Sequence, residues 1–300
     1  MAHTLPCGHH VAHDHQPHYC DYLRLSELLQ LQPPAEQLRH PDEHLFVTTH
    51  QSIEIWFKQI IFELQRCIES LDSDNVGLAI WLIRRINRIS AILTTTLQLM
   101  DSMAPSDFFA FRPYLAPASG AESQQFREIE LLVGVRNPEY RCALERLGQE
   151  PGQPATRMWT ERMQALWESR SLRAALLELF ERRKLAPEDV YVVAPQPNPD
   201  ADLFLLIEEL LDFDEAMTLW RAAHARIAER AIGPILSGTA HSSGISHLEA
   251  TIASRRFFPE LWQARTRLWE QRVKAIGSSA EHACPRLPSS FTPAPGSAHE

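Results

Sequence analysis

Residues 44–64 read HLFVTTHQSIEIWFKQIIFEL and form the longest apolar stretch of the chain. Apolar residues recur in it at steps of three and four, which is the spacing of one face of an α-helix. Charged residues interrupt the stretch, so we expect a helix buried in a protein core and not a membrane span. The helix is expected to begin near Pro41-Asp42, where Asp42 can cap free amides, and to run to about Asp72.

The same spacing continues from Asp21 to Ala275, with hardly any of the strict alternation that marks strands. Further helices are expected near Leu23–Leu31, Asp74–Met103, Ser123–Val133, Pro138–Leu147, Thr156–Ser169, Leu172–Arg183 and Asp202–Ile232. The one candidate strand, Tyr191–Val193, is too short to found a sheet. The sequence therefore predicts an all-α fold, a helical bundle.

One helical domain is expected over residues 19–276, between two disordered tails. Residues 1–18 hold six of the fourteen histidines and little that could pack. They are interpreted as a disordered tail, with a metal-binding arm as the alternative, because imidazole commonly ligates transition metals. Residues 277–300 are rich in Pro, Ser and Ala, a composition typical of disorder.

Charge and cysteine content exclude several classes of protein. The chain has 38 acidic and 29 basic residues, a formal charge of -9, so neither nucleic acid nor an anionic membrane is an expected partner. Five scattered cysteines form no CxxC or CxxCH pattern, which argues against a disulfide scaffold, a zinc ribbon and covalently attached heme. No export signal is evident, so the expected location is the cytoplasm.

Two of the expected helices carry a single histidine within an apolar stripe. Phe46, His50, Ile53 and Phe57 share one helical face, and His224 lies in a similar stripe of a later helix. Such a histidine can be a core residue bonded to a backbone carbonyl. It can equally ligate heme iron, which neutral imidazole does in oxygen-handling heme proteins. Periodicity alone does not separate these alternatives.

Arg112 follows the aromatic run 108–111, FFAF. An arginine in an apolar site can bind a substrate carboxylate through two parallel hydrogen bonds. The alternative is a surface arginine or a structural ion pair. This feature is not specific by itself.

Several longer motifs occur in order along the chain. They are 19–25 YCDYLRL, 42–46 DEHLF, 50–59 HQSIEIWFKQ, 85–89 RINRI, 111–112 FR, 115–120 LAPASG, 123–127 SQQFR, 220–224 WRAAH, 238–239 GT, 242–244 SSG and 248–251 LEAT. Taken together, they resemble the tryptophan 2,3-dioxygenase family of the heme-dependent aromatic oxygenase superfamily. A set of long motifs that agree in order is far more specific than any single one.

The resemblance implies a helical bundle that encloses one heme b per subunit. With O2, such an enzyme opens the indole ring of L-tryptophan to give N-formyl-L-kynurenine. By resemblance, His224 would be the axial ligand of the heme iron and His50 the distal histidine that meets the ring nitrogen of the substrate. Phe46 would line the pocket that binds the aromatic ring of the substrate. Arg112 would bind the substrate carboxylate, helped by Thr239 from a mobile loop.

The resemblance also assigns roles outside this pocket. Ser119 would lie beside the heme propionates. Tyr19, Tyr22 and Leu23 would reach into the pocket of a neighbouring subunit, so the expected enzyme is a homotetramer. Aromatic residues from a second chain would exclude water from the oxygen chemistry.

Three positions depart from the family pattern. The family loop reads Gly-Thr-Gly-Gly, whereas here His241 replaces a glycine, and Cys20 and His247 also differ. These departures keep open a monooxygenase that inserts one oxygen atom into a tryptophan derivative or L-tyrosine in natural-product biosynthesis. A non-catalytic heme or amino-acid sensor is a third alternative, against which the retained His50 argues.

Overall fold

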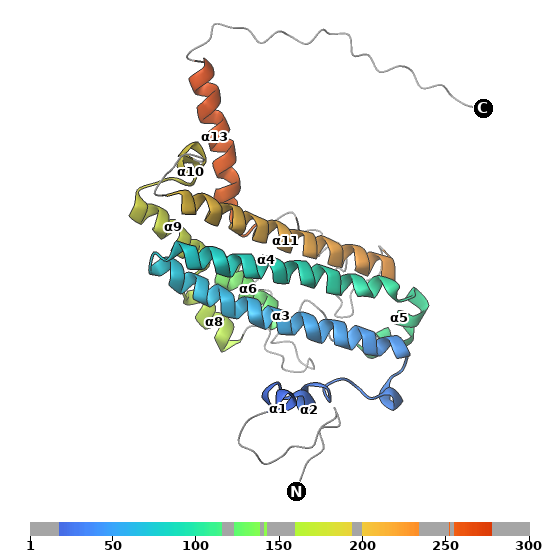
Figure 1. Ribbon diagram of the computed structural model, residues 1–300. Helices are drawn as coiled ribbons and strands as arrows, with labels where there is room; N and C mark the ends of the chain where they lie inside the picture. The colour runs from blue at the N-terminus through green and yellow to red at the C-terminus, as the bar shows by residue number, and fades with distance from the viewer. Residues whose placement is uncertain are drawn as a thin grey trace, which may run out of the picture.

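Three long helices form the centre of the fold (Figure 1). They are α3 (Pro41–Asp72), α4 (Val76–Gln98) and α11 (Ala201–Ile232). In this computed structural model the described residues are 18–115, 123–138, 141–142, 160–193, 200–233, 252 and 255–277. Within these ranges every regular element is a helix, which confirms the predicted all-α class.

The α4 helix packs against both α3 and α11. It runs antiparallel to α3, because Arg85 on α4 pairs with Glu63 on α3 while the later Cys67 approaches the earlier Ala79. It runs parallel to α11, since Arg84 pairs with Glu209 and Ser90 lies beside Met217. Helices α3 and α11 are therefore antiparallel to each other.

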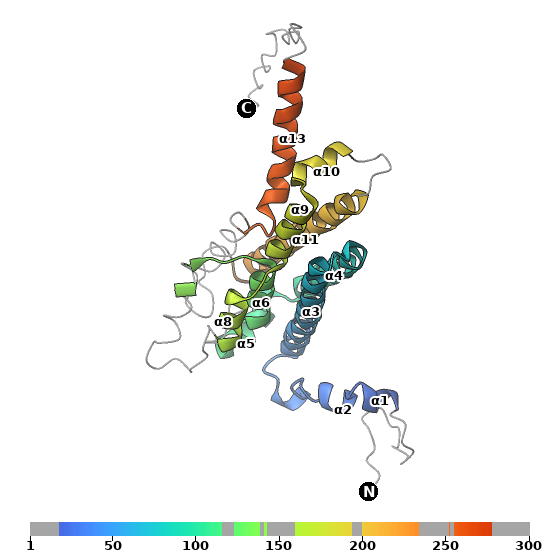
Figure 2. The ribbon, with the colours of Figure 1, turned by 90° about the vertical axis from the view of Figure 1, so that its left-hand side faces the viewer.

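Shorter helices make up the rest of the fold, with α6 and α8 to one side of α3 and α4 (Figure 2). They are α1 (Tyr19–Tyr22), α2 (Leu25–Leu28), η1 (Ala35–Gln37), η2 (Leu99–Ser102), α5 (Pro105–Phe111), η3 (Arg112–Tyr114), α6 (Gln124–Val133), α8 (Glu161–Glu168), α9 (Leu172–Arg183), α10 (Pro187–Val193) and α13 (Pro259–Gly277). Both views show α13 projecting from the bundle with α10 packed at its base, and α1 and α2 lying apart from the bundle.

One apolar core joins α3, α4, α6, α9 and α11. Its fully buried members include Phe57, Ile60, Leu64, Leu82, Ile83, Ile86, Leu93, Leu206 and Leu210. Burying each such side chain stabilises the fold by roughly 1.5–3 kcal/mol. Helix α3 is buried as predicted along the face that carries Phe57 and Leu64, but Ile55 and Phe62 on its other side are more than half exposed. No helix in the described ranges is long and apolar enough to cross a bilayer.

Two predicted helix starts need correction. The N-cap of α3 is His40, whose ring accepts the amide of Asp42, so Asp42 is inside the first turn and is not the cap. The predicted helix Leu23–Leu31 is only the short α2, Leu25–Leu28, in the structure, because Arg24 adopts a left-handed backbone conformation with φ 52° and separates α2 from α1. A left-handed residue cannot continue an α-helix.

The candidate strand Tyr191–Val193 is wrong, because these residues end helix α10. Acidic Glu188 and Asp189 occupy the first turn, where they favour a helix start. The Tyr191 ring packs edge-on against Phe204 of α11, at 5.9 Å between centroids, so packing overrides the β-propensity of the local sequence.

Some of the remaining predictions agree with the structure, and others concern residues that the structure does not describe. Helix α9 has the predicted bounds, and Ser123 caps α6 by accepting the amide of Phe126. Most of the expected helix Pro138–Leu147 lies outside the described residues, as do residues 1–17 and 278–300 of the expected tails. The domain bounds 19–276 therefore stay a prediction.

Candidate functional site

An aromatic triad ties together three helices that carry the sequence motifs. Phe57 of α3, Phe126 of α6 and Trp220 of α11 contact one another at 5.2–5.6 Å between ring centroids. Such distances lie in the favourable range for aromatic pairs. The triad therefore fixes the point at which α3 and α11 approach each other.

The two predicted histidines lie on the same side of this triad. His50 lies N-terminal to Phe57 on α3, and His224 lies C-terminal to Trp220 on α11. Because the two helices are antiparallel, both histidines lie on the same side of the triad. The two imidazoles are also close enough that His50, in its protonated form, lowers the pKa of His224, after the larger effect of burial. The structure thus brings both histidines to one region between α3 and α11.

The ring of His50 is bonded to its own helix. Its Nδ1 lies 2.8 Å from the carbonyl oxygen of Phe46, and the two rings stack at 4.2 Å. A carbonyl only accepts, so Nδ1 carries the proton and donates it. Burial lowers the pKa of His50, against the opposing effects of that hydrogen bond and of Glu54, so the ring is neutral. Its Nε2 is therefore a hydrogen-bond acceptor.

The ring of His224 is in a different state. Within the described part of the chain no hydrogen bond reaches either of its nitrogens, and its nearest aromatic neighbour is Trp220, at 5.8 Å between ring centroids. Burial, helped by the charge of His50, lowers its pKa to about 4. At neutral pH His224 is a neutral imidazole whose lone pair is available to a metal ion.

An aromatic wall extends from His50 to Arg112. Phe46 contacts Phe108 at 5.9 Å and Phe111 at 5.6 Å, and the latter two contact each other at 5.3 Å. Helix α5, which carries Phe108 and Phe111, packs against both α3 and α11. Arg112 follows directly as the first residue of η3 and is half-buried. The predicted clamp residue is thus placed beside the aromatic wall.

Other predicted site residues lie elsewhere. Tyr19 and Tyr22 on α1 are 74% and 77% exposed, and Leu23 is also exposed. Figures 1 and 2 show α1 apart from the bundle, so these side chains do not contribute to the site of their own chain. Ser119 and Thr239 lie outside the described residues.

The residues present fit a heme between α3 and α11. A porphyrin supplies the equatorial ligands of its iron, so one neutral imidazole suffices from the protein. His224 offers that imidazole. The buried Nε1 of Trp220, one helical turn before it, has no hydrogen-bond partner among the described residues, and such a buried donor next to the ligand suits a group with acceptor oxygens. The described residues contain no cluster of three or more His, Cys, Asp or Glu that could hold a metal ion by themselves.

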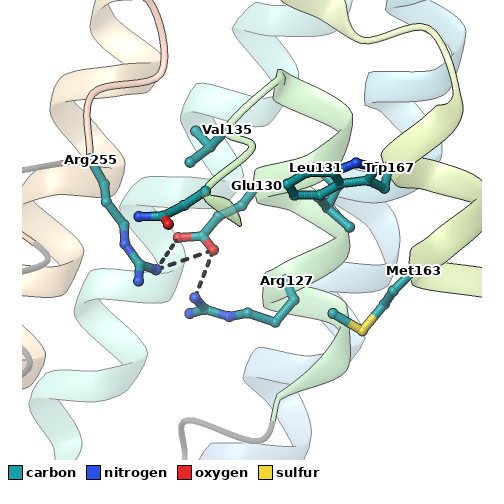
Figure 3. Close-up of a pocket in the computed structure, with 8 residues that line it drawn as sticks. Arg127, Glu130, Leu131, Val135, Met163, Trp167 and Arg255 are labelled. Atoms are coloured by element: carbon teal, nitrogen blue, oxygen red, sulfur yellow. Dashed lines mark hydrogen bonds and ion pairs between the residues drawn. The ribbon is translucent and has the colours of Figure 1, made fainter. Parts of the chain in front are cut away.

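Two features of this region were not predicted from the sequence. In the sequence, Trp220 stands out only as part of the motif WRAAH. Its position one turn before His224, on the same side of the helix, is the signal that could have identified it. The second is a pocket beside a buried carboxylate, shown in Figure 3. It is lined by Arg127, Glu130, Leu131, Val135, Asn137, Met163, Trp167 and Arg255. Neither of the two site histidines lines this pocket.

The fold and site define an all-helical protein in which two neutral imidazoles, from antiparallel helices, lie in one region beside a group of aromatic rings. A family model described as tryptophan 2,3-dioxygenase matches residues 4–174 and 189–268. The chain therefore belongs to the tryptophan 2,3-dioxygenase family.

Individual relatives agree with this assignment. A tryptophan 2,3-dioxygenase of Herpetosiphon aurantiacus is 35% identical over 261 residues, covering 83% of this chain and 98% of the relative. One of Caulobacter vibrioides is 32% identical over 276 residues, with the same coverage. One of a Nocardioides species is 35% identical over 267 residues and is covered to 94% of its length. The resemblance stated from the motifs is confirmed.

Proposed function

We propose that this chain is a heme-dependent dioxygenase that opens the indole ring of L-tryptophan with O2 to give N-formyl-L-kynurenine. Family membership supports the reaction. The observation in the structure that carries it is the pair formed by His50 and His224. One imidazole is fixed as an acceptor by its own helix, whereas the other keeps its ring nitrogens available.

His224 would hold the heme iron as its axial ligand. Its depressed pKa favours the neutral ring, which is the form that ligates metals. The nearby Trp220 indole would donate to an acceptor of the cofactor. When bound, heme supplies the reactivity toward O2, and the protein contributes binding, orientation and a dry pocket.

The residues around His50 would bind the substrate. Phe46 would wall its aromatic ring, and Arg112 would bind its carboxylate through charge-assisted hydrogen bonds. The Nε2 of His50 would accept the ring N–H, because Nδ1 is already committed to the Phe46 carbonyl. Held at both ends, the indole double bond would be oriented for reaction, which is the main benefit that positioning can supply.

The remaining predicted roles are proposed from the resemblance. Thr239 would assist Arg112, and Ser119 would lie beside the propionates of one heme b per subunit. The exposed Tyr19, Tyr22 and Leu23 would enter the pocket of a neighbouring subunit in a homotetramer. Their exposure supports this role, because large apolar side chains on a short isolated element gain by being covered. The cytoplasmic location stays a prediction.

Labelled oxygen tests the proposed function. Anaerobically reduced, heme-loaded protein is mixed with L-tryptophan or L-tyrosine and then with ¹⁸O2, and the product mass is measured. The proposal predicts ring-opened product from L-tryptophan that contains both labelled atoms. Incorporation of a single atom would support the monooxygenase alternative, and heme binding without turnover would support a sensor.

A further inference from the structure

An arginine just before α3 contacts the turn that carries Arg112. The guanidinium carbon of Arg39 lies 4.3 Å from the centre of the Tyr114 ring, a distance typical of a cation–π contact. Tyr114 and Arg112 belong to the same three-residue turn, η3, with Pro113 between them. The proline ring fixes one backbone angle of that turn, so a contact that holds Tyr114 also restrains Arg112.

A buried carboxylate limits the positions that Arg39 can take. Glu43, in the first turn of α3, is 8% exposed. Its Oε2 accepts the backbone amide of Arg39 at 2.8 Å, and its Oε1 lies 3.4 Å from Nη1 of the same arginine. A free arginine side chain has many rotamers, and a partner at both ends of the residue reduces their number. The position that the guanidinium takes is the one over the Tyr114 ring.

A second contact holds the chain on the other side of Arg112. Nδ1 of His40 accepts the amide of Asp42, so the neutral ring carries its proton on Nε2. That Nε2 lies 3.8 Å from Oδ1 of Asp107, in the first turn of α5. Asp107 precedes Arg112 in the chain and Tyr114 follows it. The segment that carries Arg112 is therefore held to the start of α3 on both sides of that residue.

These contacts join the two parts of the proposed substrate site. Phe46 and His50, which would meet the substrate ring, lie on α3 shortly after this segment, whereas Arg112 lies on η3. The distance between the two parts decides whether one substrate molecule can reach both. Because Tyr114 is 64% exposed, its contact with Arg39 adds little to the apolar core, and orienting η3 is the effect that this contact can have.

We propose that Glu43, Arg39 and Tyr114 form a brace that positions Arg112 for the carboxylate of the substrate. This inference rests on the proposed function. The three residues act through η3 and do not touch the substrate. Disrupting the brace should weaken the binding of L-tryptophan only while Arg112 is present, and it should leave the heme content unchanged.

Two replacements of Tyr114 test the brace. Tyr114→Ala removes the ring and Tyr114→Phe keeps it, and folding should tolerate both because the side chain is exposed. Arg39→Gln removes the cation from the other side of the contact. Arg66→Gln is the matched control, because Arg66 also pairs with a buried glutamate and lies over an aromatic ring, but both of these partners are on α3 itself.

Heme content from the Soret band, kcat and the KM for L-tryptophan are measured for each protein. Tyr114→Ala and Arg39→Gln should each raise KM about threefold with kcat unchanged, in line with the loss of one exposed cation–π contact that acts equally on the ground state and the transition state. Tyr114→Phe and Arg66→Gln should lie near the wild type. All of these variants should retain full heme content.

A double variant distinguishes positioning from a general loss of structure. In the Arg112→Leu background, Tyr114→Ala should lower kcat/KM no further, because the residue that the brace positions is already absent. An unchanged KM in Tyr114→Ala, an equal rise in Arg66→Gln, or a further loss in the double variant overturns the brace. Lack of L-tryptophan turnover by the wild type is a separate outcome, since it refutes the proposed function and with it the positioning role.

Discussion

Helices α3 and α11 are both 32 residues long, and each carries one site histidine in an otherwise apolar stripe. Their surroundings differ. On α3 the ring of His50 is bonded to the carbonyl of Phe46, whereas on α11 no hydrogen bond within the described residues reaches His224. The same sequence pattern therefore holds a hydrogen-bonded imidazole in one helix and an available imidazole in the other. This difference is the basis for the two proposed roles, an orienting group and a metal ligand.

The largest expected effect comes from replacing the available imidazole. His224→Ala should be purified without heme, and activity should fall at least about a thousandfold, equivalent to roughly 4 kcal/mol. The Soret absorbance and steady-state turnover measure both quantities. His44→Ala, which alters an exposed histidine of α3, is the control and should keep its heme.

Arg112→Leu should lower kcat/KM for L-tryptophan about a hundredfold, since hydrogen bonds to a charged group contribute roughly 1.5–3 kcal/mol. Heme content should stay unchanged, because Arg112 is assigned to the substrate. Indole analogues that lack the carboxylate provide the control. If they lose as much activity as L-tryptophan does, Arg112 does not bind the carboxylate.

A smaller effect on activity is expected for His50, the site histidine of α3. His50→Ala should keep its heme and lower kcat/KM about tenfold, as expected for losing one hydrogen bond of about 1.5 kcal/mol. A substrate methylated at the ring nitrogen cannot donate that bond, so wild type and variant should use it equally well. A loss of heme in His50→Ala would mean that the two histidines have been assigned the wrong way round.

The last expected effect is on the stability of the apo-protein and not on its activity. The pKa of His224 is about 4 in the folded chain, below the ordinary value of 6.5, so the unfolded chain binds the proton more readily. Stability should therefore fall as pH drops from about 6.5 toward about 4, by at most about 3.5 kcal/mol at about 1.4 kcal/mol per unit. Urea unfolding of apo-protein measures this loss, and His224→Ala should show less of it.

Periodicity was sufficient to predict the long helices. The stripes through Phe57 on α3 and Leu210 on α11 follow the helical repeat, and the structure buries both residues. The sequence-based assignment of secondary structure failed where the local residue preferences differ from the structure. Tyr191–Val193 looks like a strand because its residues favour pleated sheets, yet packing on Phe204 and the acidic first turn make it helical. Arg24 breaks a predicted helix although its residue type gives no such signal.

The site was predicted in part. The sequence singled out His50 and His224, but their proximity depends on the antiparallel arrangement of α3 and α11, which no local pattern encodes. The contact of Glu130 with Arg255 was not predictable for the same reason, because the two residues lie far apart in the sequence. Spacing along one helix can be read from the chain, whereas contacts between helices require the fold.

The central claim is that the heme iron is bound through the imidazole of His224, and a cavity rescue tests it most directly. His224→Gly should be purified without heme and should regain a histidine-type Soret spectrum when heme and free imidazole are added together. His50→Gly should bind heme without added imidazole. Full heme binding by His224→Gly in the absence of imidazole would contradict the account.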